Sequence, residues 1–267
     1  MNLTGLLLTR NRPAMLRRML DHINDFPFNI YVLDGSDHLY KEMQTVCAQH
    51  PLRHYCHMPG LWPSQRLIEI SDRIRTNYVL SMADDDFFIN HGIQRAITVL
   101  DENPDVAAAQ GSFWIEHRQG GSNLYDLEAR GPSLMEDDCL NRINAHCRQF
   151  SHTYYAVHRN DIYFQSMRNA GLFNDYGFFY EWAQSLTTVA MGKIVRFAWP
   201  YCIRTANYDG HHQAKYTHHP VTWRQTDSET YQQAIAYFLS RCRSLPPFDL
   251  LIRKADLDIR LNLAVYL

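Results

Sequence analysis

The chain has 267 residues, which is enough for one large α/β domain or two small ones. Its 26 basic and 28 acidic residues give a formal net charge of −2, so no positive excess favours a nucleic-acid partner. No apolar stretch approaches the roughly 20 residues that span a bilayer. The six cysteines include no C-x-x-C pair, which argues against a zinc site and is typical of reduced thiols in a cytoplasmic protein.

The first third of the chain predicts the start of a parallel sheet. Residues 3–9 form an apolar run of strand length, and apolar residues at helical spacing follow it. A second apolar run covers residues 29–33, so strand, helix and strand succeed one another as in a β–α–β unit. Ser64 is a suitable N-cap for a helix over 65–75, and residues 77–82 predict a third strand.

The rest of the chain predicts alternating helices and strands, without a repeat or a linker. Helices are expected at 92–102, 159–170, 177–191, 228–243 and 250–267. Strands are expected at 106–114, 154–158 and 193–203, the last of them bent or split in two. Irregular polar segments are expected at 119–138 and 205–220.

Three of the predicted strands end in polar clusters. These clusters are residues 9–12, 34–37 and 84–86. In an open parallel sheet, ligands bind outside the carboxyl ends of the strands. We therefore expect the three clusters to line one crevice.

The triplet Asp84-Asp85-Asp86 carries the sharpest chemical signal. Neighbouring carboxylates repel one another unless a cation lies between them. Mg²⁺ or Mn²⁺ binds through one or two carboxylates together with the phosphates of a ligand. The alternative is a solvated acidic run that caps the next helix.

Asp34 ends the second predicted strand and is followed by Gly35. An acid at this place can accept hydrogen bonds from a base or a ribose, as in dinucleotide-binding folds. A plain turn is an equal alternative, since Asp-Gly and Gly-Ser are turn formers.

Four motifs carry a resemblance to a known family. They are Leu-Leu-Thr-Arg-Asn-Arg-Pro at 7–13, Val-Leu-Asp-Gly-Ser at 32–36, Pro-Ser-Gln-Arg at 63–66 and Tyr-Val-Leu-Ser-Met-Ala-Asp-Asp-Asp-Phe-Phe at 78–88. With these motifs the chain resembles the GT-A nucleotide-sugar glycosyltransferases, most of all their bacterial family-2-like branch, over roughly residues 3–215. The last motif contains the D-x-D signature. The resemblance implies an α/β, Rossmann-like fold with a mostly parallel twisted sheet flanked by helices.

The family also implies an organisation of the chain and roles for matching residues. A single domain is expected, with a donor half at about 1–115, an acceptor and catalytic half at about 116–220 and C-terminal helices at about 228–267. Nucleotide-sugar contacts fall on Thr9, Arg10, Arg12, Asp34, Ser36, Arg66, Asp84, Asp85 and Lys215, with Arg204 as an alternative to Lys215 at the leaving diphosphate. Ligands of a Mn²⁺ or Mg²⁺ ion fall on Asp86, Asp84, and His211 or His212. Within the triplet, Asp84 is favoured for ribose and Asp86 for metal.

The aromatic stretch around Glu181 resembles the segment that carries the family's catalytic base. An inverting transferase needs a carboxylate that takes the proton of the acceptor hydroxyl. Glu181 is the first candidate, because burial among aromatic residues would raise its pKa toward the working pH, and Asp175 is the second. The alternative role of Glu181 is to complement a helix dipole. The family's usual Glu-Asp pair is here Tyr180-Glu181-Trp182, which departs from the pattern.

The predicted activity is metal-dependent transfer of a sugar, as in the hexosyltransferases. The donor is a nucleotide-sugar, with a UDP-sugar favoured, and the acceptor is a glycan or a lipid-linked glycan in surface polysaccharide assembly. Peripheral contact with the inner face of the cell membrane is compatible with such an acceptor.

Three other activities remain as alternatives. A sugar nucleotidyltransferase should carry a Gly-rich loop after the first strand, and none is present at 9–13. A two-metal phosphohydrolase needs carboxylates and histidines at separate strand ends, and no H-x-D or N-H-E cluster appears. A non-catalytic carbohydrate-binding domain differs from a glycosyltransferase in releasing no nucleoside diphosphate from a nucleotide-sugar.

Overall fold

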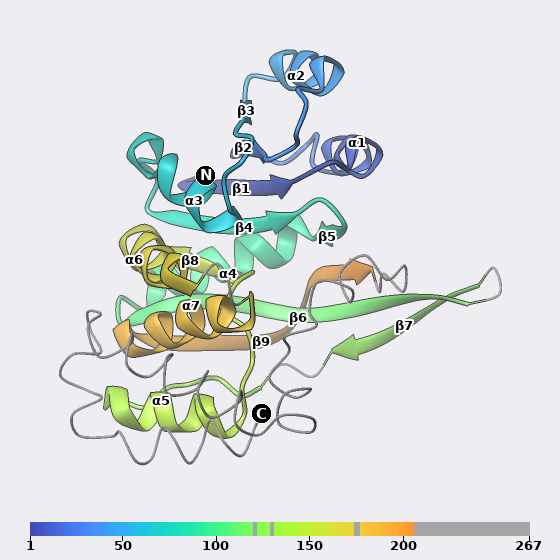
Figure 1. Cartoon of the computed structure of the whole chain (residues 1–267). Coiled ribbons are helices and arrows are strands. Elements are labelled where there is room, and N and C mark those ends of the chain that lie inside the picture. The colour runs from blue at the N-terminus through green and yellow to red at the C-terminus, as the bar shows by residue number, and fades with distance from the viewer. Residues whose placement is uncertain (120–121, 129–130, 174–176, 206–267) are drawn as a thin grey trace, which may run out of the picture.

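A twisted nine-stranded sheet forms the centre of the protein (Figure 1). The computed structural model describes residues 1–119, 122–128, 131–173 and 177–205. The strands are β1 (Leu3–Thr9), β2 (Asn29–Asp34), β3 (Arg53–His57), β4 (Tyr78–Ala83), β5 (Asp86–Phe88), β6 (Val106–Gln119), β7 (Ser122–Glu128), β8 (Val157–Arg159) and β9 (Lys193–Thr205). Eight of them follow the order β3-β2-β1-β4-β8-β6-β9-β5, and β7 pairs with β6.

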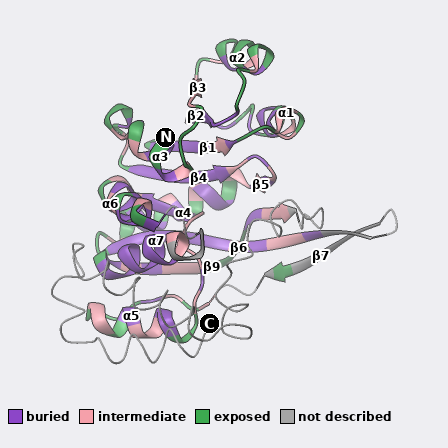
Figure 2. Ribbon diagram, viewed as in Figure 1, coloured by how far each residue is buried: buried purple, intermediate pink, exposed green. Residues whose placement is uncertain are grey.

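Helices flank this sheet (Figure 1). They are α1 (Pro13–His22), α2 (Lys41–Ala48), α3 (Pro63–Glu69), α4 (Asn90–Glu102), α5 (Cys139–Arg148), α6 (Asn160–Ala170) and α7 (Gly177–Met191), with short 3₁₀ turns at Ser71–Arg73 and Gly171–Phe173. Buried residues run along the strands and the helix faces that meet them, as Figure 2 shows.

The strands β3, β2, β1 and β4 form a parallel half-sheet. Leu3, Leu6 and Leu7 of β1 have no exposed surface. Leu3 and Leu7 belong to the same core cluster as Leu16 of α1, whereas Leu6 packs in the cluster of Leu67 of α3. Strands covered by helices on both faces read as continuous apolar runs, which explains why β1 was predictable.

The second half of the sheet is mixed. β8 pairs antiparallel with β4 and β6, and β5 and β7 pair antiparallel with β9 and β6. β6 and β9 form a long parallel pair with several register shifts. At one of these, a Cβ on Gly111 would lie 2.4 Å from the Trp199 carbonyl oxygen, so the close approach requires glycine.

The predicted fold class is confirmed, since parallel pairing predominates and helices flank the sheet. The irregular segment expected at 119–138 is wrong over β7, which extends the sheet from β6, and is confirmed over 131–138, which contains no helix or strand. Ser64 is not the N-cap of α3: Trp62 holds that position, Pro63 is the first helical residue, and the helix ends at Glu69. The elements expected after residue 205 lie outside the described residues.

Buried hydrogen bonds hold α7 against β8 and the segment before it. Gln184 Nε2 lies 3.2 Å from His158 Nε2 and donates to Thr188 Oγ1 at 3.1 Å. Gln184 Oε1 accepts from Thr153 Oγ1 at 3.1 Å. All four side chains have no exposed surface. Buried polar groups are tolerated when they are paired, and a paired network specifies one arrangement of its helices.

Two buried histidines make the fold sensitive to acid. Burial lowers the pKa of His158 from 6.5 to about 4 and that of His146 from 6.5 to about 3. The unfolded chain therefore takes up these protons at a higher pH than the folded chain does. The free energy of unfolding should fall as the pH drops below 6.5. Each of the two histidines contributes up to about 1.4 kcal/mol for every pH unit. Denaturant titrations at a series of pH values measure this slope.

The substitution His146→Leu should flatten the slope. Both ring nitrogens of His146 lack a hydrogen-bond partner, so leucine removes the titrating group without breaking a hydrogen bond. The control is His38→Leu, the same change at a histidine that lies exposed on the surface. An unaltered slope in His146→Leu would contradict the assignment.

Candidate active site

The ends of β1, β2 and β4 bring three predicted site residues together. Thr9 is the register partner of Asp34 on β2. Thr9 Oγ1 donates a hydrogen bond to Asp84 Oδ2 at 2.6 Å, just past the end of β4. All three residues are buried. These contacts confirm that the three polar strand ends converge.

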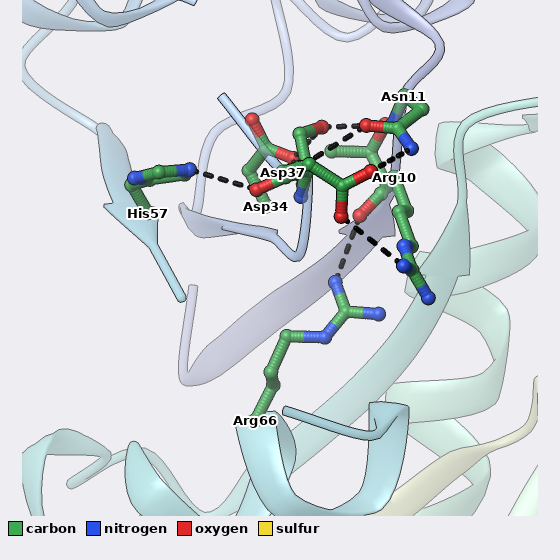
Figure 3. Close-up of polar contacts among 8 residues, drawn as sticks. Arg10, Asn11, Asp34, Asp37, His57 and Arg66 are labelled. Carbon is green, nitrogen blue, oxygen red and sulfur yellow. Dashed lines mark hydrogen bonds and ion pairs between the residues drawn. The ribbon is translucent and has the colours of Figure 1, made fainter. Parts of the chain in front are cut away.

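The Asp34 carboxylate anchors the turn that follows β2 (Figure 3). Its Oδ1 accepts hydrogen bonds from the Ser36 backbone N–H, at 2.8 Å, and from the Ser36 hydroxyl. Its Oδ2 accepts a hydrogen bond from the Tyr55 hydroxyl. Burial raises the pKa of Tyr55, and the hydrogen bond to Asp34 raises it further, so the phenol stays a donor.

The loop after β1 is tied to the same turn. The Asn11 backbone N–H donates to Ser36 Oγ at 2.7 Å, and Asn11 adopts a φ of 54°, in the left-handed region that asparagine tolerates. The Asn11 side-chain amide and Arg10 Nη2 donate to the Asp37 carboxylate, at 2.9 and 3.2 Å. His57 Nε2 lies 2.9 Å from the Ser36 carbonyl oxygen. Figure 3 shows these contacts around Asp34 and Asp37.

Arg66 of α3 lies beneath this turn. Its Nη1 donates to the carbonyl oxygens of Thr9, at 2.8 Å, and Leu33, at 2.5 Å. A Cβ on Gly35 would lie 2.7 Å from the Arg66 Cζ, so glycine leaves the space for the guanidinium. Arg66 therefore lies beside Thr9 and the Asp34 turn, and burial lowers its pKa. Its contact with a nucleotide-sugar stays a prediction.

A pocket of about 350 Å³ opens beside the Asp34 turn, between β3 and α3. Its lining includes Tyr55 and His57, which contact Asp34 and the Ser36 carbonyl group. The pocket therefore adjoins the Asp34 side of the site.

Arginines balance the charge of the Asp triplet. Arg12 Nη1 lies 2.9 Å from Asp84 Oδ1 and 2.8 Å from Asp85 Oδ2. Arg204 of β9 is the register partner of Asp86, and its Nε lies 3.6 Å from Asp86 Oδ2. Burial raises the pKa of Asp84, while the hydrogen bond from Thr9 and the charge of Arg12 oppose that shift.

The triplet suits a metal only in part. Within the described ranges, no three His, Cys, Asp or Glu side chains are grouped so that they could hold a metal ion. Asp84 and Asp86 are nonetheless buried carboxylates with hard oxygen donors, the kind that Mg²⁺ and Mn²⁺ prefer. These ions usually take the rest of their ligands from a bound phosphate, so the residues present fit a metal shared with a diphosphate.

Glu181 lies on α7 in a different setting from the one expected. Its side chain is 41% exposed, so the expectation of burial is wrong. Its Oε2 lies 3.1 Å from His152 Nδ1. Burial chiefly raises the pKa of Tyr154 to about 12, and the Glu181 charge raises it further, while Ser81 and Arg66 act in the opposite sense. Tyr154 therefore lies within electrostatic reach of both Glu181 and the Arg66 side of the site.

Several contacts here were not predicted. Tyr55 lies on a half-buried strand that has no apolar run to reveal it. His152 and Tyr154 lie in the segment before β8, and nothing near them in sequence signals their contacts with α7. Four predicted site residues, Asp175, His211, His212 and Lys215, lie outside the described residues.

Comparison with known proteins supports the fold. No family model and no curated protein matches the sequence. Solved structures do match. For S. aureus TarS residues 1–349, the TM-score is 0.50 with 16% identity, over 98% of this chain and 77% of that one. For the same fragment in complex with UDP-GlcNAc, the TM-score is 0.54 with 16% identity, over 92% of this chain and 68% of that one. For another structure of S. aureus TarS, the TM-score is 0.50 with 15% identity, over 98% of this chain but only 47% of that one.

At this level of identity the match shows a glycosyltransferase-like fold, and the family-2-like branch stays a prediction. Among the described helices, none combines the length and the apolar character needed to cross a membrane.

Gly35→Ala should disturb the Arg66 contacts. The added methyl group would force the guanidinium away from the carbonyl oxygens of Thr9 and Leu33. Losing buried hydrogen bonds of a charged donor typically costs about 1.5–3 kcal/mol. Denaturant unfolding measures the loss. Gly171→Ala is the control, because its added Cβ would make only ordinary contacts, at 3.5 Å or more. Equal stability of the two variants would disprove the steric argument.

Proposed function

We propose that this protein is a metal-dependent glycosyltransferase that moves a sugar from a nucleotide-sugar, preferably a UDP-sugar, to a glycan or lipid-linked acceptor. The convergence of Thr9, Asp34 and Asp84, with Arg66 beneath them, carries the proposal. The complex of TarS with UDP-GlcNAc supports it through the shared fold. The hexosyltransferase class, a role in surface polysaccharide assembly and a cytoplasmic location belong to the same proposal.

The buried side of the site suits a nucleoside. Asp34 offers acceptor oxygens to the N–H or O–H groups of a base or ribose, in exchange for the bond from Tyr55. Asp84, held by Thr9, offers acceptors to ribose hydroxyls. Sites whose buried polar groups must be paired discriminate strongly between ligands, because a ligand that lacks the partner leaves them unpaired.

Charge balance supports a divalent cation. Asp84 and Asp85 share one guanidinium, that of Arg12, and Asp86 faces Arg204. A bound diphosphate would add further negative charge beside these three carboxylates. A Mn²⁺ or Mg²⁺ ion held by Asp86 and Asp84 together with the diphosphate would neutralise the leaving group.

Residues outside the described ranges complete the proposal. His211 or His212 is the proposed third ligand, since imidazole binds Mn²⁺. Lys215 is the proposed contact of the leaving diphosphate.

Glu181 is the proposed base of an inverting reaction, with Asp175 as the second candidate. The 41% exposure of Glu181 leaves its carboxylate accessible to an acceptor hydroxyl. Tyr180, the residue before it, packs against the core cluster that contains Leu6 of β1 and Leu33 of β2, which supports a position near the donor. A base there takes the hydroxyl proton as the oxygen attacks the sugar.

Asp84→Asn should weaken the binding of UDP at least about tenfold, which corresponds to about 1.4 kcal/mol. The amide keeps the size of the side chain but loses the charge that pairs with Arg12 and one acceptor for ribose. Titration calorimetry with UDP measures the change. Asp21→Asn is the control, because Asp21 also pairs with an arginine but lies exposed on α1. If both variants bound UDP equally well, Asp84 would not be a donor contact.

Chelation of metal with EDTA should stop the release of UDP from UDP-GlcNAc, and so should Asp86→Asn. Both remove the cation that the proposal assigns to the leaving diphosphate. A coupled assay for UDP measures the reaction, and circular dichroism checks that the variant is folded. Undiminished release of UDP in EDTA would exclude the metal.

A further inference from the structure

His152 is paired with Glu181 at the start of α7. Its Nδ1 lies 3.1 Å from Glu181 Oε2. The two side chains are 32% and 41% exposed, so the pair is open to solvent. The His152 Nδ1 atom itself is buried and makes no aligned hydrogen bond, so its 3.1 Å approach to Oε2 is a close polar contact.

The ring of His152 contacts an aromatic neighbour, and the backbone beside it is anchored to α7. Phe150 contacts it edge to face, with ring centroids 4.8 Å apart, and Phe150 stacks in turn on Trp182 at 4.3 Å. The next residue, Thr153, is fixed to α7, because its backbone N–H donates to Ser185 Oγ at 3.2 Å. The backbone beside His152 and the helix that carries Glu181 are thus joined by buried contacts.

The pair lies toward the donor side of the site. Tyr154 follows His152 by two residues, and its hydroxyl accepts a hydrogen bond from Tyr180 at 3.3 Å. Tyr154 and Tyr180 both pack against the core cluster that contains Leu6 of β1 and Leu33 of β2, the strands that lead to Thr9 and Asp34.

We propose that His152 is a positioning residue for the base: a small rotation of its ring lets Nδ1–H donate to Glu181 Oε2, and this bond fixes the carboxylate for proton transfer. This role rests on the proposed function. In the step it serves, the acceptor O–H bond breaks and its proton passes to Glu181, while the oxygen bonds to the anomeric carbon. The bond from that carbon to the diphosphate breaks, and its electron pair leaves with the diphosphate. His152 keeps its proton throughout.

An asparagine in place of His152 separates positioning from proton transfer. The asparagine amide can present an N–H group close to where Nδ1 lies, but it is no base. His152→Asn should therefore retain most of the activity. His152→Ala should lower kcat for UDP release from UDP-GlcNAc by about tenfold to a hundredfold, less than the about 10² to 10⁴ expected for loss of the base itself. KM for UDP-GlcNAc should change little in either variant, because Thr9, Asp34 and Arg66 are untouched.

His54→Ala provides the matched control. His54 is also a partly buried histidine paired with a side-chain oxygen, that of Asn29 at 3.0 Å, but it lies on β3 away from α7. Its replacement should leave kcat unchanged. If His152→Asn were as inactive as His152→Ala while both stayed folded, the positioning role would be overturned.

A measurement without turnover tests the contact itself. The ¹⁵N shifts of His152, assigned by comparison with His152→Ala, should show the proton on Nδ1 and should change in Glu181→Gln. A proton on Nε2, or shifts indifferent to Glu181→Gln, would overturn the role even in an active transferase. A wild-type protein that shows the expected shifts but turns over no nucleotide-sugar would instead overturn the proposed function, and the role with it.

Discussion

The arrangement of the site depends on the two hydrogen bonds from Arg66 to the carbonyl oxygens of Thr9 and Leu33. The side chain of Arg66 is buried, and hydrogen bonds offset the cost of burying its charge. Two strand ends supply them at Nη1, Nε has no partner among the described residues, and Gly35 leaves room for the guanidinium. Helix α3 cannot move along the sheet without leaving that charge unpaired. These bonds therefore fix the position of α3 along β1 and β2. They also fix the Asp34 turn, which lies next to the Arg66 guanidinium.

The same logic keeps three consecutive carboxylates stable at the end of β4. Repulsion among Asp84, Asp85 and Asp86 is offset by guanidinium groups from opposite sides, Arg12 after β1 and Arg204 on β9. Because the strands deliver these arginines, the triplet keeps its geometry in the absence of a ligand. Preorganised charges of this kind avoid the cost of reorganisation when a charged ligand arrives.

The convergence of the three polar strand ends was predictable from the sequence, and the surroundings of Glu181 were not. Asp34 and Asp84 follow apolar runs, and parallel topology brings such strand ends together without any knowledge of side-chain contacts. The short strand β5 exists because it pairs with β9, a partner far away in the sequence, so no local pattern announces it. The pairing of His152 with Glu181 likewise depends on how α7 packs. The 41% exposure of Glu181 also shows that aromatic neighbours in the sequence do not establish burial of a side chain.

Helix α7 carries the proposed base, and its rotation about its own axis decides where Glu181 points. Apolar packing alone resists such rotation weakly, since it is not directional. Gln184 lies one turn after Glu181 on the same face, and its amide binds Thr153 and Thr188 within the buried network. Thr153 adjoins His152, so the bonds that set the rotation of α7 also set the separation of His152 and Glu181. The buried polar network occupies space that apolar side chains could fill, and its directional hydrogen bonds define where the Glu181 carboxylate points.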